Sequence, residues 1–409
     1  MTASRIDLKN PDLYTEGVPH DVFAELRRNC PVYRQDEEDG PGYWAVTRHA
    51  DVTAVSRDST TFSSALGTTQ IDEFDEETRR KQAAMLVNLD PPEHTRLRQL
   101  VSRGFTPRAV RTLEGHIRGI CNRVVDDLVE RGRDGAVVDF VPVAAAPLPL
   151  EVIAALLGAP GEDVDRLCDW SDRMIGFDDP EYGNTRADGE LAAAEIFLYA
   201  NEIAAARRAE PRDDIVSRLV RPDENGDTLT EMEFDMFFVL LGVAGNGNET
   251  TRNAAAGGMQ AFVDHPEQWR RLQAEPELAA GAVEEILRWV TPVIGFRRTP
   301  TCPATIGGQP VEAGDKVVVY YPSANRDEDV FEDPHVFDIG RTHNPHVAFG
   351  GTGVHFCLGA HLARLELRIL FETLARRIER VEPAGPVRRL RSNFVNGIKS
   401  MPVRVYPKG

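Results

Sequence analysis

Cys357 stands in the stretch of the chain whose residue types and spacing most clearly point to chemistry. It follows residues 349–356, whose sequence is Phe-Gly-Gly-Thr-Gly-Val-His-Phe, and an apolar pattern with helical spacing begins directly behind it. At a helix N-terminus, unpaired N–H groups and the helix dipole lower the pKa of a thiol and favour the metal-binding thiolate. One cysteine without a CxxC partner suits an axial haem ligand better than zinc. The alternative is a buried structural cysteine.

Glu249 and Thr250 form the second chemical signal. They lie in an apolar pattern that predicts a long helix from Thr230 to about Asp264, with Thr230 and Glu233 as its capping box. The glycines and asparagines of residues 244–248 weaken that helix locally. An acid followed by a hydroxyl is suited to moving protons toward a bound ligand. The alternative is a surface Glu–Thr pair at a helix bend.

His94 and Arg98 follow a Pro-Pro pair and share one face of a predicted helix at i,i+4 spacing. Two such groups on one face can clamp an anion. The alternative is a solvated basic face, because Arg96 and Arg103 lie nearby.

The remaining patterns predict the elements that must position these residues. Short hydrophobic stretches, capping residues and glycine–proline stops predict helices over 19–29, 149–157, 162–175, 189–209, 266–275 and 278–290. Alternating or β-branched stretches predict strands at 32–34, 43–46, 296–299, 304–306 and 316–321. Residues 62–90 show weak periodicity and are expected to form a long irregular loop.

Composition narrows the class of protein. The 409 residues carry a formal net charge of -18, which argues against nucleic-acid binding. Five cysteines, odd in number and scattered, fit a reducing cytoplasm better than a disulfide framework. The first residues lack the apolar core of a signal peptide, and residues 236–244 are too short to span a bilayer. We therefore expect a cytoplasmic protein without membrane insertion.

The pattern Gly351-x-Gly353-x-His355-x-Cys357-x-Gly359 resembles the haem-binding loop of the cytochrome P450 family, the haem-thiolate monooxygenases. The resemblance covers nearly the whole chain. It implies one domain over residues 1–409, a mainly α fold with small β-sheets, and haem b between the long central helix and the helix behind the cysteine.

The resemblance also implies roles for individual residues. Cys357 would be the axial ligand of the haem iron, and Glu249 with Thr250 would deliver protons. The groups holding the haem would be His94, Arg98, Arg298 and His355. Substrate would be bordered by Val293, Ile294, Phe296 and Val395. Glu285, Arg288 and Arg341 would form a buried charge cluster that supports the fold.

Two positions depart from the family pattern. Gly350 stands where phenylalanine is usual, and Asn246 stands where alanine or glycine is usual. The first departure is similar to a variant found in actinobacterial members that oxidise sterols and branched lipids. The second puts the local geometry of the central helix in question.

By this resemblance, the protein is expected to hydroxylate a hydrophobic small molecule, such as a sterol, terpenoid or branched fatty chain, with O₂. Electrons would come from ferredoxin and ferredoxin reductase, because residues 351–356 lack the third glycine of a dinucleotide-binding loop. A basic docking patch for this partner would comprise Arg103, Arg108 and Arg111.

Four other functions remain as alternatives. A secondary-metabolite hydroxylase of the macrolide-tailoring type would differ only in substrate. A peroxide-driven haem hydroxylase typically lacks the Glu249–Thr250 pair, and a non-catalytic haem sensor would not need a proton path. A cysteine hydrolase using Cys357 with a histidine would need no haem and would be colourless when purified.

Overall fold

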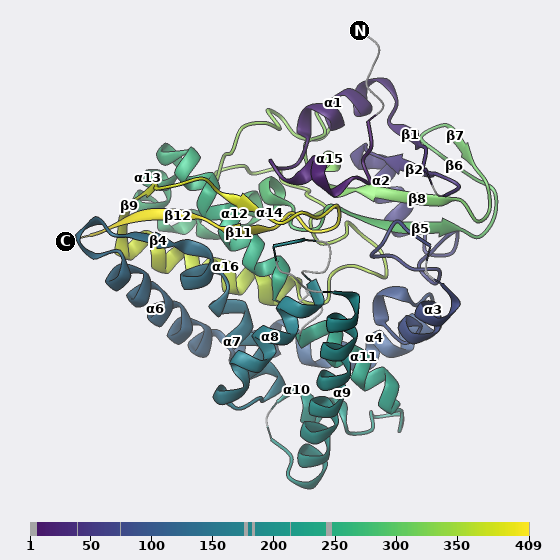
Figure 1. The fold of residues 1–409 in the computed structure, drawn as a ribbon, viewed down its shortest axis with the longest axis horizontal. Coiled ribbons are helices and arrows are strands. Elements are labelled where there is room, and N and C mark those ends of the chain that lie inside the picture. Colours follow the sequence, from purple (N-terminus) through teal and green to yellow (C-terminus); the bar gives the residue numbers. More distant parts are fainter. Residues whose placement is uncertain are drawn as a thin grey trace.

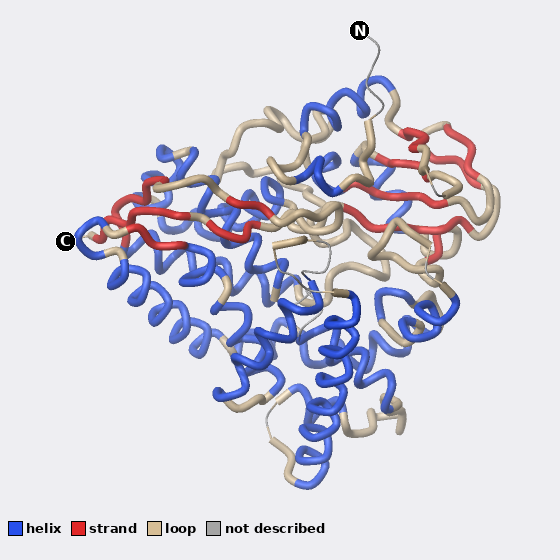
Figure 2. The backbone as a smooth tube through the Cα atoms, viewed as in Figure 1, coloured by secondary structure: helices blue, strands red, loops and turns tan. Residues whose placement is uncertain are grey.

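The computed structural model describes residues 6–38, 40–73, 75–175, 179–181, 185–212, 214–242 and 248–408. Most of the described chain is helical, and short strands gather in small sheets (Figures 1 and 2). The largest sheet lies to the right in this view, and the long helices fill the left and lower parts. This is the mainly α architecture with small sheets that the sequence predicts.

The largest sheet has the strand order β1-β2-β8-β5-β3. Its bounds are β1 Val32–Gln35, β2 Tyr43–Val46, β3 Phe62–Ser63, β5 Gly295–Pro300 and β8 Lys316–Tyr320. All pairs are antiparallel except β2 with β8. Strand β8 is buried along its whole length, which explains its run of consecutive valines. Helices α1 (His20–Asn29), α2 (His49–Arg57) and α15 (Tyr321–Ala324) lie beside this sheet.

The helical body is built around α12 (Glu249–Asp264), which contacts α14 (Ala279–Val290) and α16 (Ala360–Arg377). A Cβ atom at Gly257 would lie 2.8 Å from the Val290 side chain, and one at Gly258 would lie 2.8 Å from Ile286 and Phe371. Glycine weakens a helix interior by about 1 kcal/mol. Here it lets two neighbouring helices approach α12 closely.

The predicted helices occur close to their expected bounds. Helix α7 (Pro147–Leu157) ends at Gly158, whose φ of 67° is the left-handed conformation that glycine favours. The other helices are α4 Glu93–Ser102, α5 Pro107–Thr112, α6 Glu114–Arg131, α8 Val164–Ile175, α9 Arg186–Ala209, α10 Ile215–Leu219, α11 Glu231–Gly242 and α13 Pro266–Ala274. The remaining strands are β4 Val137–Asp139, β6 Ala304–Ile306, β7 Gln309–Val311, β9 Ile378–Pro383, β10 Arg388–Arg389, β11 Ile398–Ser400 and β12 Pro402–Pro407.

Two expectations about the elements need comment. The stretch 62–90 is not one irregular loop, because it contains α3 (Glu76–Gln82), capped by the Asp75 side chain on the N–H of Thr78. The long central helix is seen as α11 and α12, and residues 243–247 between them, including Asn246, lie outside the described residues. Within the described chain, no helix combines the length and the apolar character needed to cross a bilayer.

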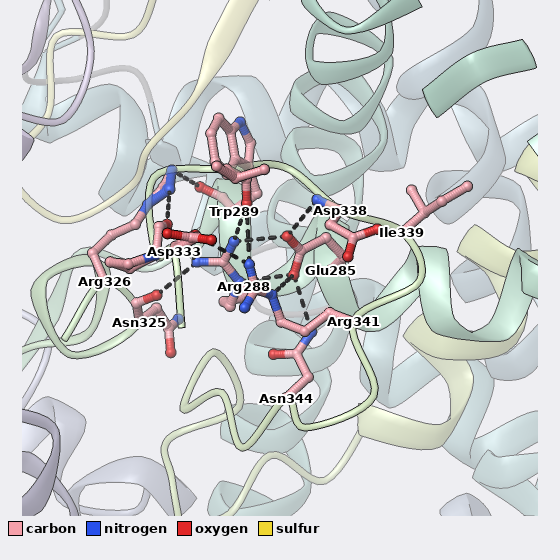
Figure 3. A network of polar contacts seen from close by, with 12 residues as sticks. Glu285, Arg288, Trp289, Asn325, Arg326, Asp333, Asp338, Ile339, Arg341 and Asn344 are labelled. Atoms are coloured by element: carbon pink, nitrogen blue, oxygen red, sulfur yellow. Dashed lines mark hydrogen bonds and ion pairs between the residues drawn. The ribbon is translucent and has the colours of Figure 1, made fainter. Parts of the chain in front are cut away.

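Glu285 and Arg288 form a fully buried ion pair on α14 (Figure 3). The guanidinium of Arg288 donates to both carboxylate oxygens at 2.7 and 2.8 Å and to three backbone carbonyls. Arg341 and Asn344 each donate to Glu285 at 3.2 Å. We call these four residues the Glu285 cluster. Every charge in it has a partner within the protein, as a buried charge requires.

Candidate active site

A cavity lies where α4, α12, β5 and the loop before α16 meet. Its polar lining comes from Thr68, His94, Arg98, Thr250, Thr251, Arg298, Tyr321, His355, Cys357 and Glu366. Its apolar lining includes Leu86, Val87, Phe105, Ile153, Phe237, Ala254, Leu287, Val293, Phe296, Phe349, Leu358 and Leu362. The cavity therefore combines a limited set of polar groups with a largely apolar lining, as binding sites for small molecules usually do.

The loop that carries Cys357 depends on its glycines. Gly350 and Gly353 have φ values of 90° and 114°, which a side chain rarely adopts. A Cβ atom on Gly353 would also lie 2.6 Å from the backbone oxygen of Ser56. The N–H of Cys357 donates to the carbonyl of Phe349 at 3.0 Å, which closes the loop. Gly350 is thus a conformational requirement in this chain.

Cys357 lies on the cavity wall directly before α16, which begins at Ala360. Burial raises the pKa of its thiol, although backbone N–H groups of Gly359 and Ala360 and the charges of Arg98 and Arg364 act to lower it. The sequence-based expectation of a net lowering is therefore wrong for the thiol in this cavity. The helix N-terminus acts as expected, but the loss of water around the sulfur outweighs it.

Four nitrogen-bearing side chains share the wall next to Cys357, and we call them the donor wall: His94, Arg98, Arg298 and His355. The rings of His94 and His355 are 4.3 Å apart between centroids. Burial lowers the pKa of His94 to about 4 and that of His355 to about 2, and neighbouring arginines add to both shifts. Both imidazoles are therefore neutral at pH 7.

The protein itself satisfies the donor wall only in part, although Nε2 of His355 lies 3.1 Å from the hydroxyl oxygen of Ser64. Neither ring nitrogen of the buried His94 has a hydrogen-bond partner. Arg98 donates to the carbonyl of Phe356, and Arg298 donates to the carbonyl of Arg297 at 2.8 Å. Among the described residues, neither arginine is within ion-pair distance of a carboxylate, and burial lowers the pKa of both.

This arrangement fits haem b. The group needs an apolar slot, one axial ligand and partners for two propionates. The cavity offers Cys357, two arginines without a carboxylate partner and the unpaired ring of His94. No group of three or more His, Cys, Asp or Glu side chains that could hold a bare metal ion occurs among the described residues. A single thiolate beside guanidinium groups instead suits a metal that a macrocycle already holds through its own ring nitrogens.

Glu249 and Thr250 lie at the N-terminus of α12 on different sides of the cavity wall. Thr250 lines the cavity, whereas Glu249 is buried behind it with 1% of its surface exposed. One Glu249 oxygen accepts from Arg252 at 2.7 Å and from Asn253 at 2.8 Å, and the other has no partner. The carboxyl of Glu249 therefore lies in the protein interior, and Thr250 lies between it and the cavity.

The residues expected to border the substrate are only partly on the wall. Val293 and Phe296 line the cavity. Ile294 does not: its fully buried side chain packs with Phe23 and Tyr320 beside the large sheet. Val395 is buried and pairs by a β-bridge with Val293, without lining the cavity itself. Both assignments came from the family resemblance. For Ile294 the reason is that extended backbone sends successive side chains to opposite sides, so that Val293 faces the cavity and Ile294 the core.

Sequence reasoning missed two groups of wall residues. The apolar members Leu86, Phe105, Ile153 and Phe237 come from separate elements and carry no motif. Glu366 is different, because it lies on the same helical face as Leu362 and Ile369, where an acid is out of place. It is fully buried, and burial raises its pKa to about 8. A charged residue on the apolar stripe of α16 was the available signal.

Comparison with known proteins agrees with this site. A family model described as Cytochrome P450 matches residues 189–393. A steroid C26-monooxygenase of Rhodococcus jostii is 45% identical over 97% of this chain and 84% of its own length. A methyl-branched lipid omega-hydroxylase of Mycobacterium bovis is 40% identical over 97% and 94%, respectively. A Mycobacterium marinum cytochrome P450 solved with pseudoionone superposes with a TM-score of 0.86 at 40% identity, covering 94% of each chain.

The fold and the site thus define a haem-thiolate enzyme, and the chain belongs to the cytochrome P450 family. It is a monooxygenase with haem b as its cofactor, and it hydroxylates a hydrophobic small molecule. These findings confirm the family, fold, cofactor and reaction type predicted from the sequence.

Proposed function

We propose that Cys357 is the axial ligand of the haem iron and that the donor wall receives the two propionates. The observation that carries this proposal is the coincidence, in a largely apolar cavity, of one cysteine with two arginines that lack a carboxylate partner and with the unpaired ring of His94. Bound there, haem b supplies O₂ activation and insertion of one oxygen atom into a C–H bond, and a thiolate ligand favours O–O cleavage.

The chain's own part in the reaction is proton delivery and placement. Thr250 presents its hydroxyl to the cavity, and Glu249 behind it can hold a proton on its unpartnered oxygen. Arg252 bridges Glu249 at 2.7 Å and Asp172 of α8 at 3.9 Å, which leads from the acid toward a partly exposed carboxylate. T250A is expected to consume O₂ and NAD(P)H but to form little hydroxylated product. The reduced oxygen should leave as hydrogen peroxide instead, because proton delivery is then poorly directed.

The substrate we propose is a sterol, a terpenoid or a methyl-branched lipid, oxidised at a terminal carbon. Support comes from the relatives, named for steroid C26 and for the omega position of a methyl-branched lipid, and from the solved relative that holds pseudoionone. The apolar wall formed by Phe105, Phe237, Val293 and Phe296 suits such a chain.

A spectral titration tests the substrate class. Sterols, branched lipids and terpenoids should each be added to the ferric protein while the Soret band is recorded. We expect a shift with at least one of these classes. Shifts given only by macrolides would instead favour the secondary-metabolite alternative.

The electron donor we propose is a ferredoxin served by its reductase, because residues 351–356 lack the third glycine of a dinucleotide-binding loop. Of the suggested docking residues, Arg103 is paired with Asp223 at 3.1 Å, which makes it a weak candidate. Arg108 and Arg111 are exposed, and Arg111 borders a surface hollow with His361 and Arg368. The double variant R108E/R111E should slow reduction by ferredoxin and leave reduction by dithionite unchanged.

A ligand substitution tests the whole proposal. C357S should abolish the thiolate-type ferrous–CO spectrum, because a serine hydroxyl is a weaker and less electron-rich ligand. An unchanged spectrum would refute the assignment of Cys357. C121S, at a buried cysteine outside the cavity, is the matched control and should leave the spectrum intact.

A further inference from the structure

Glu284 directly precedes Glu285 on α14, yet it belongs to a different network of polar contacts. It accepts two hydrogen bonds from Arg364 of α16, at 2.7 Å from Nε and 2.8 Å from Nη2. This is the bidentate geometry in which arginine binds carboxylates most firmly. Its second oxygen also lies 3.0 Å from Nε2 of His346.

His346 reaches Glu284 through its Nε2 atom. The N–H of Ala348 donates to Nδ1 of His346 at 3.3 Å, so the ring proton lies on Nε2 and points at the carboxylate. Burial acts to raise the pKa of Glu284, but His346 and Arg364 overcome it and hold that pKa at about 2. Glu284 is therefore ionised, and one full negative charge faces Arg364.

Arg364 connects this pair to the cysteine loop. Its guanidinium carbon lies 4.5 Å from the centroid of the Phe349 ring, a cation–π contact. The carbonyl of Phe349 accepts the N–H of Cys357 at 3.0 Å. The positive charge of Arg364 also acts on the Cys357 sulfur and favours its thiolate form. Arg364 is thus held in place from one side by Glu284 and from the other by Phe349.

We propose that Glu284 and Arg364 are positioning residues that set how much positive charge the axial sulfur experiences, and thereby how readily the haem iron is reduced. The inference rests on the proposed role of Cys357. Reduction places one further electron on the iron–thiolate unit, and nearby positive charge favours that step. Glu284 offsets the charge of Arg364, so the two side chains act in opposite directions.

The opposite signs give a decisive test, a spectroelectrochemical titration of the haem in the purified holoprotein, with dithionite as the electron source. E284Q uncovers the arginine charge and should raise the ratio of ferrous to ferric protein at a fixed potential by about fivefold. R364Q leaves the carboxylate uncompensated and should lower that ratio by a similar factor. The double variant E284Q/R364Q should return close to the unsubstituted protein.

Two further variants separate charge from packing. R368Q removes an arginine one turn along α16 that pairs with Glu372 at 3.0 Å instead of Glu284, and it should not shift the potential. R364K keeps the charge and should stay closer to the unsubstituted protein than R364Q does. Shifts of the same sign in E284Q and R364Q, or equal shifts in R364K and R364Q, would overturn the proposal.

A failure of this inference can also be told apart from a failure of the Cys357 assignment. If Cys357 were not the ligand, the unsubstituted protein would lack the thiolate-type ferrous–CO band. If only the present inference fails, that band is intact and the potentials do not diverge. Should E284Q retain too little haem to titrate, R364K and R364Q decide the matter between them.

Discussion

The Glu285 cluster and the donor wall both contain buried basic side chains, but the polar groups of the two regions find their partners in opposite ways. In the Glu285 cluster, Arg288 is fully buried and spends its N–H groups on Glu285 and three carbonyls (Figure 3). On the donor wall, Arg298 is 5% exposed and has one carbonyl partner, and His94 has none. Burying a charge without a partner is costly, so a native protein rarely leaves one.

The contrast separates residues that hold the fold from residues that hold a ligand. The Glu285 cluster is fully paired within the protein and needs no ligand. The donor wall lacks anionic partners, which indicates that a bound group supplies them, and the two propionates of haem b meet that need. The neighbours Glu284 and Glu285 are both paired within the protein, but Glu285 pairs with Arg288 of its own helix whereas Glu284 pairs with Arg364 of α16.

The largest effect is expected from breaking the closed cluster. R288A leaves the Glu285 carboxylate buried without its main partner, which typically costs about 3–5 kcal/mol of stability. Urea denaturation followed by far-UV circular dichroism measures this loss. R404A, on the exposed face of β12, is the control and should change little. A stability near that of the unsubstituted protein would show that the cluster does not support the fold.

A smaller effect, on haem affinity instead of stability, is expected at the donor wall. R298L should leave the haem-free fold as stable as before, because no internal carboxylate loses its partner. Its affinity for haem should fall by about 10- to 100-fold, the range for one hydrogen bond to a charged group. Haem transfer to apomyoglobin measures the affinity. A loss of haem-free stability as large as that of R288A would erase the distinction between the two regions.

Glu366 is the opposite case from the donor wall, because it is a buried acid without a basic partner. Burial raises its pKa to about 8, whereas in the unfolded chain the carboxyl loses its proton near its ordinary pKa of 4.5. Between these values the folded state binds more protons, so stability falls as pH rises. E366Q removes this slope.

The expected result is a melting temperature that exceeds that of the unsubstituted protein by about a few degrees at pH 8, with the gap shrinking toward pH 5. E372Q, on the same helix but partly exposed and paired with Arg118, is the matched control. A gap that does not change with pH would mean that Glu366 is not a neutral acid in the fold.

Much of this molecule is readable from sequence because its signals are local. The Thr230 cap, the stop at Gly158 and the pattern around Cys357 act within a few residues, and each predicts the structure found. The pKa of Cys357 was predicted in the wrong direction because burial depends on the whole fold. Helix α3 was missed because its seven residues are all polar and carry no apolar period.

The cavity wall shows the same limit. Ile294 was expected beside the substrate, but its side chain turns into the core beside the large sheet, a choice made by strand orientation. Phe237 and Phe105 reach the cavity from distant helices, and no spacing in the sequence relates them. Arg364 and Glu284 are eighty positions apart, and only the packing of α14 against α16 brings them together.

The most direct test of the account compares the binding of haem b with that of its dimethyl ester, in which both propionates are capped. If the donor wall exists to receive these carboxylates, the unsubstituted protein should bind the ester about 10- to 100-fold more weakly than haem b. R298L should discriminate much less between the two. Equal affinity of the unsubstituted protein for both would contradict the assignment of the donor wall.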